Sequence, residues 1–451
     1  MFYNGNNFPP YIEISPASSM KGSINVPASK STSTRAILTA SLSEGISQIY
    51  NCAESNNAKA MMINCQKFGA IIERNRRGYN VAGVNIRNVP DELIFNPCNS
   101  GVVLRLLMGV AGALKTSSFI TYFHQSLGRR SHSEMILALS RLGIDCQGNT
   151  DDGLLPIRIK GQTVIKGYTE ISSRKSSQFL SGLLYLGSLS DNDLHIKVID
   201  SITAPSMVRT TINNLTAAGV HIEYDKSFTN FYVSGASKIH AGEFIVGSDP
   251  ASSAALLGIC SVVDSDVCLN GFYEEELGNG AVIEYLRHVG VTVDNGHNDT
   301  LHITGGNITK GLDFDGSLAP DAVPALAAVA AFAEGTSTFY NIEHLRYKEC
   351  NRISDFRKEL YKIGVKSEET IDSLTIFGNK NGYEGGVIVN GHYDHAIIMA
   401  LTTIGIKCKN SIMISNPYHV GQTYPLYFDD INTICGQINE LKYSGMAPEE
   451  I

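Results

Sequence analysis

The sequence contains no C-x-x-C pair, no prominent run of lysine or arginine residues and no apolar run long enough to cross a bilayer. Its nine cysteines are odd in number and scattered, which disfavours a disulfide framework or a structural zinc site and is typical of reduced thiols in a cytoplasmic protein. The net charge of −8 disfavours a nucleic acid or an anionic membrane as partner. The first residues, MFYNGNNFPPYIEI, are too polar for a signal peptide.

The length and composition indicate more than one globular domain. A chain of 451 residues exceeds what one compact core usually supports, so two domains are expected. With 43% hydrophobic and 18% charged residues, the chain resembles ordinary soluble proteins. The most apolar stretch, APDAVPALAAVAAFAEG, is interrupted by Pro320, Asp321 and Pro324 and is predicted to be a buried helix. The oligomeric state is left open by these features.

A pattern of helix, glycine and strand recurs along the chain. It occurs in QKFGAIIE, SRLGIDCQ, TAAGVHIE, RHVGVTVD and YKIGVKSE, and more weakly in TICGQI, at intervals of 71 to 76 residues. The glycines of this pattern are Gly69, Gly143, Gly219, Gly290, Gly364 and Gly436. Glycine is favoured after a helix because it adopts the left-handed conformation without strain. The spacing predicts an α/β protein of six repeats, with apolar helices inside and sheets outside; the alternative is a set of unrelated helix-to-strand turns.

Donor-rich helix starts recur in most of these units. In VPASKSTSTRA, hydroxyls and backbone N–H groups accompany Lys30 and Arg35, a combination that favours an anion. Ordinary N-capping with two solvated cations is the alternative. Similar stretches are FNPCNSGVVLR, SLGRRSHSEM, SSRKSSQFL, SDPASSA, APDAVPALAA, LRYKECNR and GHYDHAI. Together they predict a small polyanionic ligand held in one crevice.

Other sites are disfavoured or left open by the residues alone. Neither G-x-x-x-x-G-K-[ST] nor G-x-G-x-x-G is present, so a nucleotide cradle of those types is not expected, and the histidines show no metal-ligand spacing such as H-E-x-x-H. Asp321 could act as a general base or simply cap a helix. The charges of LRYKECNR could equally form a solvated helix face.

In order and spacing, these motifs resemble the 5-enolpyruvylshikimate-3-phosphate (EPSP) synthase family from about residue 20 to 430. The SKS…R and SSQF stretches fit it better than the related UDP-N-acetylglucosamine enolpyruvyl transferases. The resemblance implies a transferase of the shikimate pathway, which leads to the aromatic amino acids, with small anionic substrates and no cofactor. It also implies a two-domain inverted α/β barrel of six βαβαββ repeats, three per domain. One domain would span residues 21–246 and the other residues 1–20 plus 247–451, with the active site in the interdomain cleft.

The resemblance assigns one set of residues to shikimate 3-phosphate. Ser31 and Arg35 match positions that hold its carboxylate. Asp321 and Lys348 match the pair at the ring hydroxyls, where Asp321 would be the base for the attacking hydroxyl. The whole substrate set comprises Ser31, Arg35, Ser176, Ser177, Gln178, Thr203, His344 and Lys348. Departures from the family in this half include His344 in place of an asparagine and Ser206 in place of a tyrosine.

A second set matches the phosphoenolpyruvate half. The positions expected around that ligand or its phosphate are Asn99, Gly101, Arg130 and Arg352, to which Lys30 and Gln178 are added. Those expected to take part in catalysis are Lys30, Asp321, Glu349 and His395. Two expected cations are missing, because Ala396 stands where the family has an arginine and Gln422 where it has a lysine. His392 or His419 could compensate.

Two lost charge-assisted hydrogen bonds, at about 1.5–3 kcal/mol each, would remove roughly 3–6 kcal/mol, or about 10²–10⁴ in affinity. Three hypotheses therefore remain. The chain is a transferase that moves the enolpyruvyl group to shikimate 3-phosphate or a close analogue. Alternatively it is a lyase that eliminates phosphate from such a compound without phosphoenolpyruvate, with Lys30 stabilising the leaving phosphate and a carboxylate or His395 removing a proton. The third hypothesis is an inactive relative that only binds such a ligand.

Overall fold

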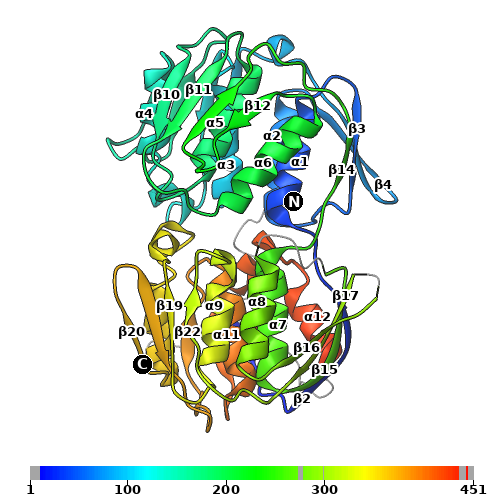
Figure 1. Cartoon of the computed structure of the whole chain (residues 1–451), viewed down its shortest axis with the longest axis vertical. Coiled ribbons are helices and arrows are strands. Elements are labelled where there is room, and N and C mark those ends of the chain that lie inside the picture. Colours follow the sequence, from blue (N-terminus) through cyan, green and yellow to red (C-terminus); the bar gives the residue numbers. More distant parts are fainter. Residues whose placement is uncertain (1–10, 273–277, 298, 436–442, 445–451) are drawn as a thin grey trace. The chain divides into compact units, whose positions relative to one another are not determined.

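The computed structural model describes residues 11–272, 278–297, 299–435 and 443–444. Its contacts divide the chain into two compact units (Figure 1). Unit 1 comprises Met1–Pro27 and Gly247–Ile451, and unit 2 comprises Ala28–Val246. The sequence placed the start of this second unit at residue 21, but it begins at Ala28. The reason is that β2 (Ser19–Asn25) pairs in parallel with β15 (Asp264–Asn270) of unit 1.

Within the described residues, each unit contains three four-stranded sheets with one common pairing pattern. Every sheet has a parallel pair at one edge, and its other two pairs are antiparallel. In spatial order, the sheets of unit 2 are β14 (Glu243–Ile245), β3 (Ile46–Tyr50), β5 (Gly78–Ala82), β4 (Ile71–Asn75); β6 (Glu92–Phe95), β7 (Thr116–Phe119), β9 (Ile157–Lys160), β8 (Asp145–Gly148); and β10 (Tyr168–Ile171), β11 (Leu194–Val198), β13 (Asn230–Val233), β12 (Ile222–Tyr224). Those of unit 1 are β16 (Thr292–Asn295), β17 (Thr300–Gly305), β15, β2; β18 (Phe314–Asp315), β19 (Thr336–Tyr340), β21 (Ser373–Phe377), β20 (Ser367–Glu369); and β22 (Ile388–Asn390), β23 (Ile412–Ser415), β1 (Tyr11–Ile14), β24 (Tyr443–Ser444).

The repeats exchange strands at the two boundaries between the units. β2 leads into α1 (Lys30–Ser41) of unit 2 but completes a sheet of unit 1. β14 leads into α7 (Pro250–Val262) of unit 1 but pairs with β3 in unit 2. β1 likewise completes the last sheet of unit 1 by pairing with β23. The architecture is the predicted α/β fold of six repeats, three in each unit.

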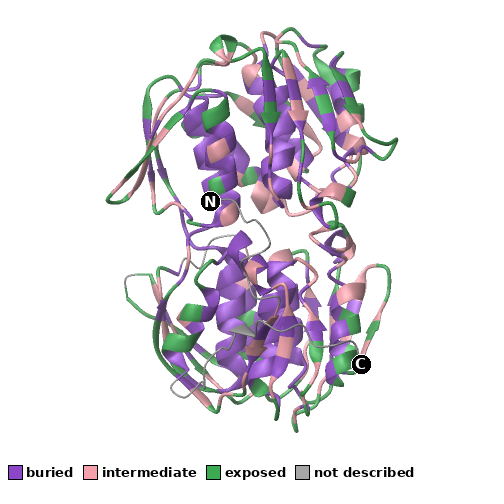
Figure 2. Cartoon of the chain, turned by 180° about the vertical axis from the view of Figure 1, so that it is seen from behind, coloured by how far each residue is buried: buried purple, intermediate pink, exposed green. Residues whose placement is uncertain are grey.

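The most buried helices form the centre of each unit, as the apolar composition predicted. Nearly every residue of these helices is buried in Figure 2. They are α1, α3 (Gly101–Ala111) and α5 (Gln178–Leu189) in unit 2, and α7, α9 (Val323–Ala330) and α11 (His395–Lys407) in unit 1. The remaining α-helices are α2 (Asn56–Lys67), α4 (Ser133–Arg141), α6 (Pro205–Ala217), α8 (Asn279–His288), α10 (Ser354–Ile363) and α12 (Tyr427–Ile434). The short 3₁₀ helices are η1 (Ile86–Asn88), η2 (Leu127–Arg129), η3 (Pro320–Ala322), η4 (Glu343–Tyr347) and η5 (Pro417–Gln422).

The repeat glycines lie directly after α2, α4, α6, α8 and α10 with positive φ. The φ values are 111° at Gly69, 86° at Gly143, 92° at Gly219, 105° at Gly290 and 95° at Gly364. The left-handed turn predicted after each of these helices is therefore confirmed. The sixth glycine, Gly436, lies outside the described residues.

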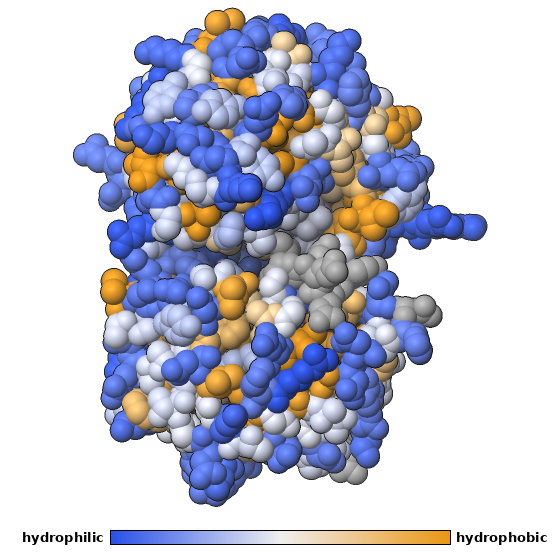
Figure 3. Space-filling model, viewed as in Figure 1, coloured by the Kyte–Doolittle hydropathy of each residue, from blue (hydrophilic) through white to orange (hydrophobic). Residues whose placement is uncertain are grey.

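The apolar stretch around Pro324 forms η3 and the buried helix α9. Among the described residues, no helix combines the length and the apolar character that a membrane span requires. The face drawn in Figure 3 is largely hydrophilic, with apolar residues distributed among polar ones.

Central helices α3 and α5 approach each other most closely at two glycines. A Cβ atom on Gly109 would lie 1.9 Å from the carbonyl oxygen of Gly182, and one on Gly182 would lie 2.4 Å from that of Arg105. Backbone atoms at this crossing leave no room for a side chain.

We predict that Gly109→Ala lowers the stability of unit 2 by about 3 kcal/mol or more, because a methyl group would have to push α3 away from α5. The thermal unfolding midpoint of the purified protein measures this. Gly258→Ala in α7 is the matched control, since its nearest contact would be 3.4 Å. An equally stable Gly109→Ala protein would contradict the packing described here.

Candidate functional site

In unit 2, two arginines converge on the first residue of α3. A Cβ atom on Gly101 would lie 2.8 Å from Nη1 of Arg130 and 3.0 Å from Nη1 of Arg105. The same Nη1 of Arg105 donates to Oε1 of Gln178 at 2.8 Å and to Oγ of Ser176 at 3.3 Å. Two guanidinium groups beside a helix N-terminus form an anion-binding arrangement, because like charges this close are stabilised by an anion.

His132 lies against these two arginines but adds no positive charge. It is fully buried, and its ring packs edge-on to that of Phe179. Burial, reinforced by Arg105 and Arg130, holds the pKa of His132 well below its usual range. The charge of this cluster at neutral pH therefore comes from the arginines.

Arg35 in α1 is a second anion-binding candidate in unit 2. Its Nε donates to Oγ1 of Thr211 at 2.7 Å and its Nη1 to the carbonyl oxygen of Ser31 at 2.9 Å. Burial lowers the pKa of Arg35 to about 10, which leaves the group charged at neutral pH. Within the described part of the chain, its buried Nη2 has no hydrogen-bond partner. A carboxylate or another anionic group could satisfy this charged donor.

The other predicted residues of unit 2 lie at the same helix starts. Lys30 and Ser31 begin α1, and Ser177 directly precedes α5; all three are buried. Thr203 donates its hydroxyl to the carbonyl oxygen of Ser173 at 2.7 Å. Asn99, just before the Ser100 cap of α3, accepts from the backbone N–H of Leu127 at 3.2 Å. Arg130 lies in the loop before α4 and not at the helix start that the sequence suggested.

In unit 1, the buried guanidinium of Arg352 joins three carboxylates. Its Nε and Nη2 bind the two oxygens of Asp394 at 2.8 and 3.1 Å. Nη1 lies 3.0 Å from Oδ1 of Asp321, and Nη2 lies 3.0 Å from Oε2 of Glu349. Although burial acts in the opposite direction, these carboxylates raise the pKa of Arg352 well above its ordinary value. The alternative that the charges of LRYKECNR form a solvated helix face is therefore wrong for Arg352, which is buried.

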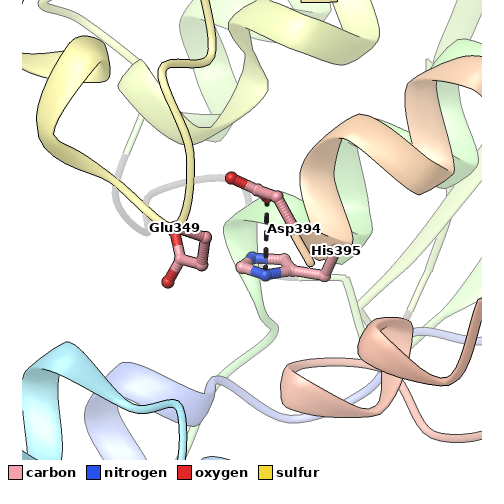
Figure 4. Close-up of side chains that lie close together, drawn as sticks. All are labelled: Glu349, Asp394 and His395. Atoms are coloured by element: carbon pink, nitrogen blue, oxygen red, sulfur yellow. Dashed lines mark ion pairs between the residues drawn. The ribbon is translucent and has the colours of Figure 1, made fainter. Parts of the chain in front are cut away.

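Glu349, Asp394 and His395 form a compact group in unit 1 (Figure 4). Each offers one potential ligand atom, and these atoms lie within 4.8 Å of one another. Nδ1 of His395 lies 3.8 Å from Oδ1 of Asp394. Both carboxylates are already paired with Arg352, whose positive charge compensates theirs. The group therefore consists of two neutralised carboxylates beside an imidazole.

Lys348 and His344 lie beside this group. Burial, followed by Lys348, lowers the pKa of His344 to about 3, although Asp321 acts in the opposite direction. His344 is therefore neutral at physiological pH. Its Nε2 is buried and makes no hydrogen bond to any residue in the described segments. The structure thus brings Asp321, His344, Lys348, Glu349 and Arg352 together.

Ala396 and Gln422, the two positions at which the resemblance implied cations, are both buried. The backbone N–H of Ala396 donates to Oδ1 of Asp394 at 2.9 Å, as part of the α11 cap. The side chain of Gln422 bonds to the carbonyl oxygen of Tyr393 and to Nδ1 of His419.

His392, one of the two suggested replacements for these cations, is engaged elsewhere. Its Nε2 lies 2.9 Å from Oε1 of buried Glu359. His419, the other candidate, remains adjacent to Gln422.

Three site residues were not among those predicted, although two of them carried a signal. Arg105 lies one turn inside α3, and Asp394 precedes His395 in a noted motif. Thr211 carried none, because it lies in the middle of α6 and its role depends on contact with Arg35.

Comparisons of the sequence and of the structure with known proteins all point to the same family. The model described as EPSP synthase (3-phosphoshikimate 1-carboxyvinyltransferase) matches residues 14–431. The chain is 54% identical to a 3-phosphoshikimate 1-carboxyvinyltransferase of Burkholderia pseudomallei (strain K96243), covering 97% of each chain. It is 34% identical to that of Deinococcus radiodurans, covering 93% of this chain and 95% of the relative. A solved EPSP synthase from Acinetobacter baumannii superposes with a TM-score of 0.76 at 25% identity, covering 94% of this chain and 98% of the other.

We predict that Arg352→Met lowers the stability of unit 1 by about 3–5 kcal/mol, because it leaves three carboxylates without their shared buried cation. The thermal unfolding midpoint of the variant measures this loss. The control is Arg357→Met on α10, which removes an exposed arginine. Equal midpoints for the two variants would contradict the importance of the buried network.

Proposed function

Because the chain belongs to the EPSP synthase (3-phosphoshikimate 1-carboxyvinyltransferase) family of transferases, we propose that it transfers the enolpyruvyl group of phosphoenolpyruvate to shikimate 3-phosphate. The observation that carries most weight is the pair of guanidinium groups over Gly101, beside Gln178. This arrangement suits an anionic phosphate or carboxylate. We expect a cytoplasmic enzyme of the shikimate pathway that works on two small anions and draws on residues of both units.

The shikimate 3-phosphate half of the proposal rests on α1 and α5. The spare Nη2 of Arg35 would bind the ring carboxylate, aided by the hydroxyl of Ser31. The hydroxyls of Ser176, Ser177 and Thr203 would bind the phosphate, with the α5 N-terminus contributing backbone N–H groups.

The reaction forms one C–O bond and breaks another. The ring hydroxyl oxygen of shikimate 3-phosphate bonds to the carbon that carries the phosphate in phosphoenolpyruvate, and its proton passes to Asp321. The bond from that carbon to the phosphate oxygen breaks, and inorganic phosphate leaves. Because the product keeps its double bond, the methylene carbon gains a proton during addition and loses one during elimination.

The remaining groups have roles in this scheme that follow from their chemistry. Lys30 and Arg130 would bind the phosphate of phosphoenolpyruvate, and their positive charge would stabilise that phosphate as it leaves. Glu349, paired with Arg352 and close to His395, is the group proposed to move the methylene proton. Arg352 orients Asp321 and Glu349 through the ion pairs described above.

The relatives do not favour the elimination alternative, because the curated matches carry the name of the transferase.

We predict that the purified protein, given both compounds, releases inorganic phosphate and forms an enolpyruvyl ether in equal amounts. Phosphorus NMR with mass spectrometry of the organic product measures both. Omission of phosphoenolpyruvate serves as the control and should abolish product. Phosphate and a dehydrated ring formed from shikimate 3-phosphate alone would overturn the proposal.

We also predict that Arg130→Gln raises the KM for phosphoenolpyruvate about 10- to 150-fold. This factor corresponds to the loss of one charge-assisted hydrogen bond of about 1.5–3 kcal/mol. The neighbouring Arg129→Gln is the matched control, because that side chain is exposed. Steady-state kinetics at saturating shikimate 3-phosphate compares the two. Similar KM values would remove Arg130 from the second-substrate site.

A further inference from the structure

The side-chain amide of Gln422, at the end of η5, has a defined orientation. Its Nε2 lies 3.1 Å from the carbonyl oxygen of Tyr393 and 3.0 Å from Nδ1 of His419. A carbonyl oxygen can only accept, so the amide nitrogen must face Tyr393. Its second proton then points to His419, whose Nδ1 must be the acceptor.

This contact specifies the protonation state of His419. With Nδ1 accepting, the imidazole is neutral and carries its proton on Nε2. Its pKa is independently lowered to about 3, chiefly by burial. His419 is therefore a neutral group at physiological pH and does not replace the missing lysine as a cation.

The other end of the amide has no partner. Gln422 is 3% exposed, and across the described residues no hydrogen bond reaches its Oε1. An unsatisfied buried acceptor costs about 1–3 kcal/mol. Oε1 therefore favours a ligand that brings a hydrogen-bond donor.

The carboxylates of unit 1 in the region of Gln422 are engaged by partners within the unit. The charged and titratable groups of this part of unit 1 come from α7, η3, η4 and the turn after it, α10, α11, η5 and α12. They include Asp249, Asp321, His344, Lys348, Glu349, Arg352, Glu359, Lys362, His392, Tyr393, Asp394, His395, Tyr418, His419 and Asp430. Glu359 is paired with His392 and Lys362, and Asp430 accepts from Tyr424. Asp249 accepts a hydrogen bond from Thr423, the residue after Gln422, and the charges of Asp394 and Glu349 act on His419.

Phosphoenolpyruvate can supply the required donor in one protonation state. Its carboxylate is ionised at neutral pH, but a phosphate monoester keeps one proton below a second pKa of about 6. We propose that Gln422 is a specificity-determining residue whose Oε1 accepts a hydrogen bond from the protonated oxygen of a phosphate monoanion. This inference rests on the proposed function and specifies the form in which its second substrate binds.

The family lysine would impose the opposite preference. An ammonium group only donates and carries a full positive charge, so it favours the phosphate dianion. Gln422→Lys should therefore make the site prefer the phosphate dianion over the monoanion, without altering the rest of the site.

The test is kcat/KM for phosphoenolpyruvate between pH 6 and pH 8 at saturating shikimate 3-phosphate. The monoanion fraction falls about 50-fold over this range for a second pKa of about 6, and the wild-type value should fall by a similar factor. Gln422→Lys should flatten or invert this dependence. Gln147→Lys, which adds the same charge at an exposed position of β8, should keep the wild-type profile.

Parallel profiles in wild type and Gln422→Lys would overturn the inference while leaving the proposed function intact. The absence of any phosphoenolpyruvate-dependent product in the wild type would instead overturn the proposed function.

A second measurement needs no variant. Calorimetric titration of the wild-type protein with phosphoenolpyruvate alone at pH 8, in buffers of different ionisation enthalpy, counts the protons taken up on binding. Binding of the monoanion from a solution of dianion requires uptake of about one proton. Binding without proton uptake would mean that Oε1 is satisfied by water or by another group and would overturn the inference.

Discussion

The close packing of three buried helices at the centre of each unit determines where the functional groups lie. In unit 2, α3 and α5 approach until the Cα of Gly182 meets the backbone of α3. This contact brings the first turns of both helices together, so that Arg105 of α3 can reach Gln178 of α5. In unit 1, Arg352 links the cap of α11 to Asp321 before α9, and Thr423 links Gln422 to the Asp249 cap of α7. The positions of the helices thus fix the positions of the charges.

The two units use their helix starts for different chemistry. In unit 2, arginines accompany the helix N-termini, and both contributions favour anions. In unit 1, carboxylates accompany them, and Asp394 caps α11 while it binds Arg352. A cationic set suits the binding of phosphate and carboxylate groups, and a set of compensated carboxylates suits proton transfer. The proposed transferase reaction requires both capabilities.

The sequence was sufficient to predict the repeat, because in the five repeats whose glycine is described a residue with positive φ is needed at the same point, and glycine fulfils that need. The first domain boundary was harder to place, since β2 pairs with a strand more than two hundred residues away. Site residues with family motifs could be named in advance, although their roles remain proposals. The partners of Arg35 and His392 could not be predicted from the sequence. These partners, Thr211 and Glu359, lie inside helices and make their contacts only through tertiary packing.

The absence of two family cations does not require a change of reaction. The loss of roughly 3–6 kcal/mol assumes that the ligand needs both charges. A phosphate monoanion carries one negative charge fewer, and its proton can satisfy Oε1 of Gln422, which recovers about 1–3 kcal/mol of an otherwise unmet hydrogen bond. The neutral pair of Gln422 and His419 also avoids placing an ammonium group against a buried imidazole. A transferase that binds the less ionised form of its second substrate would therefore reconcile the family membership with glutamine at position 422.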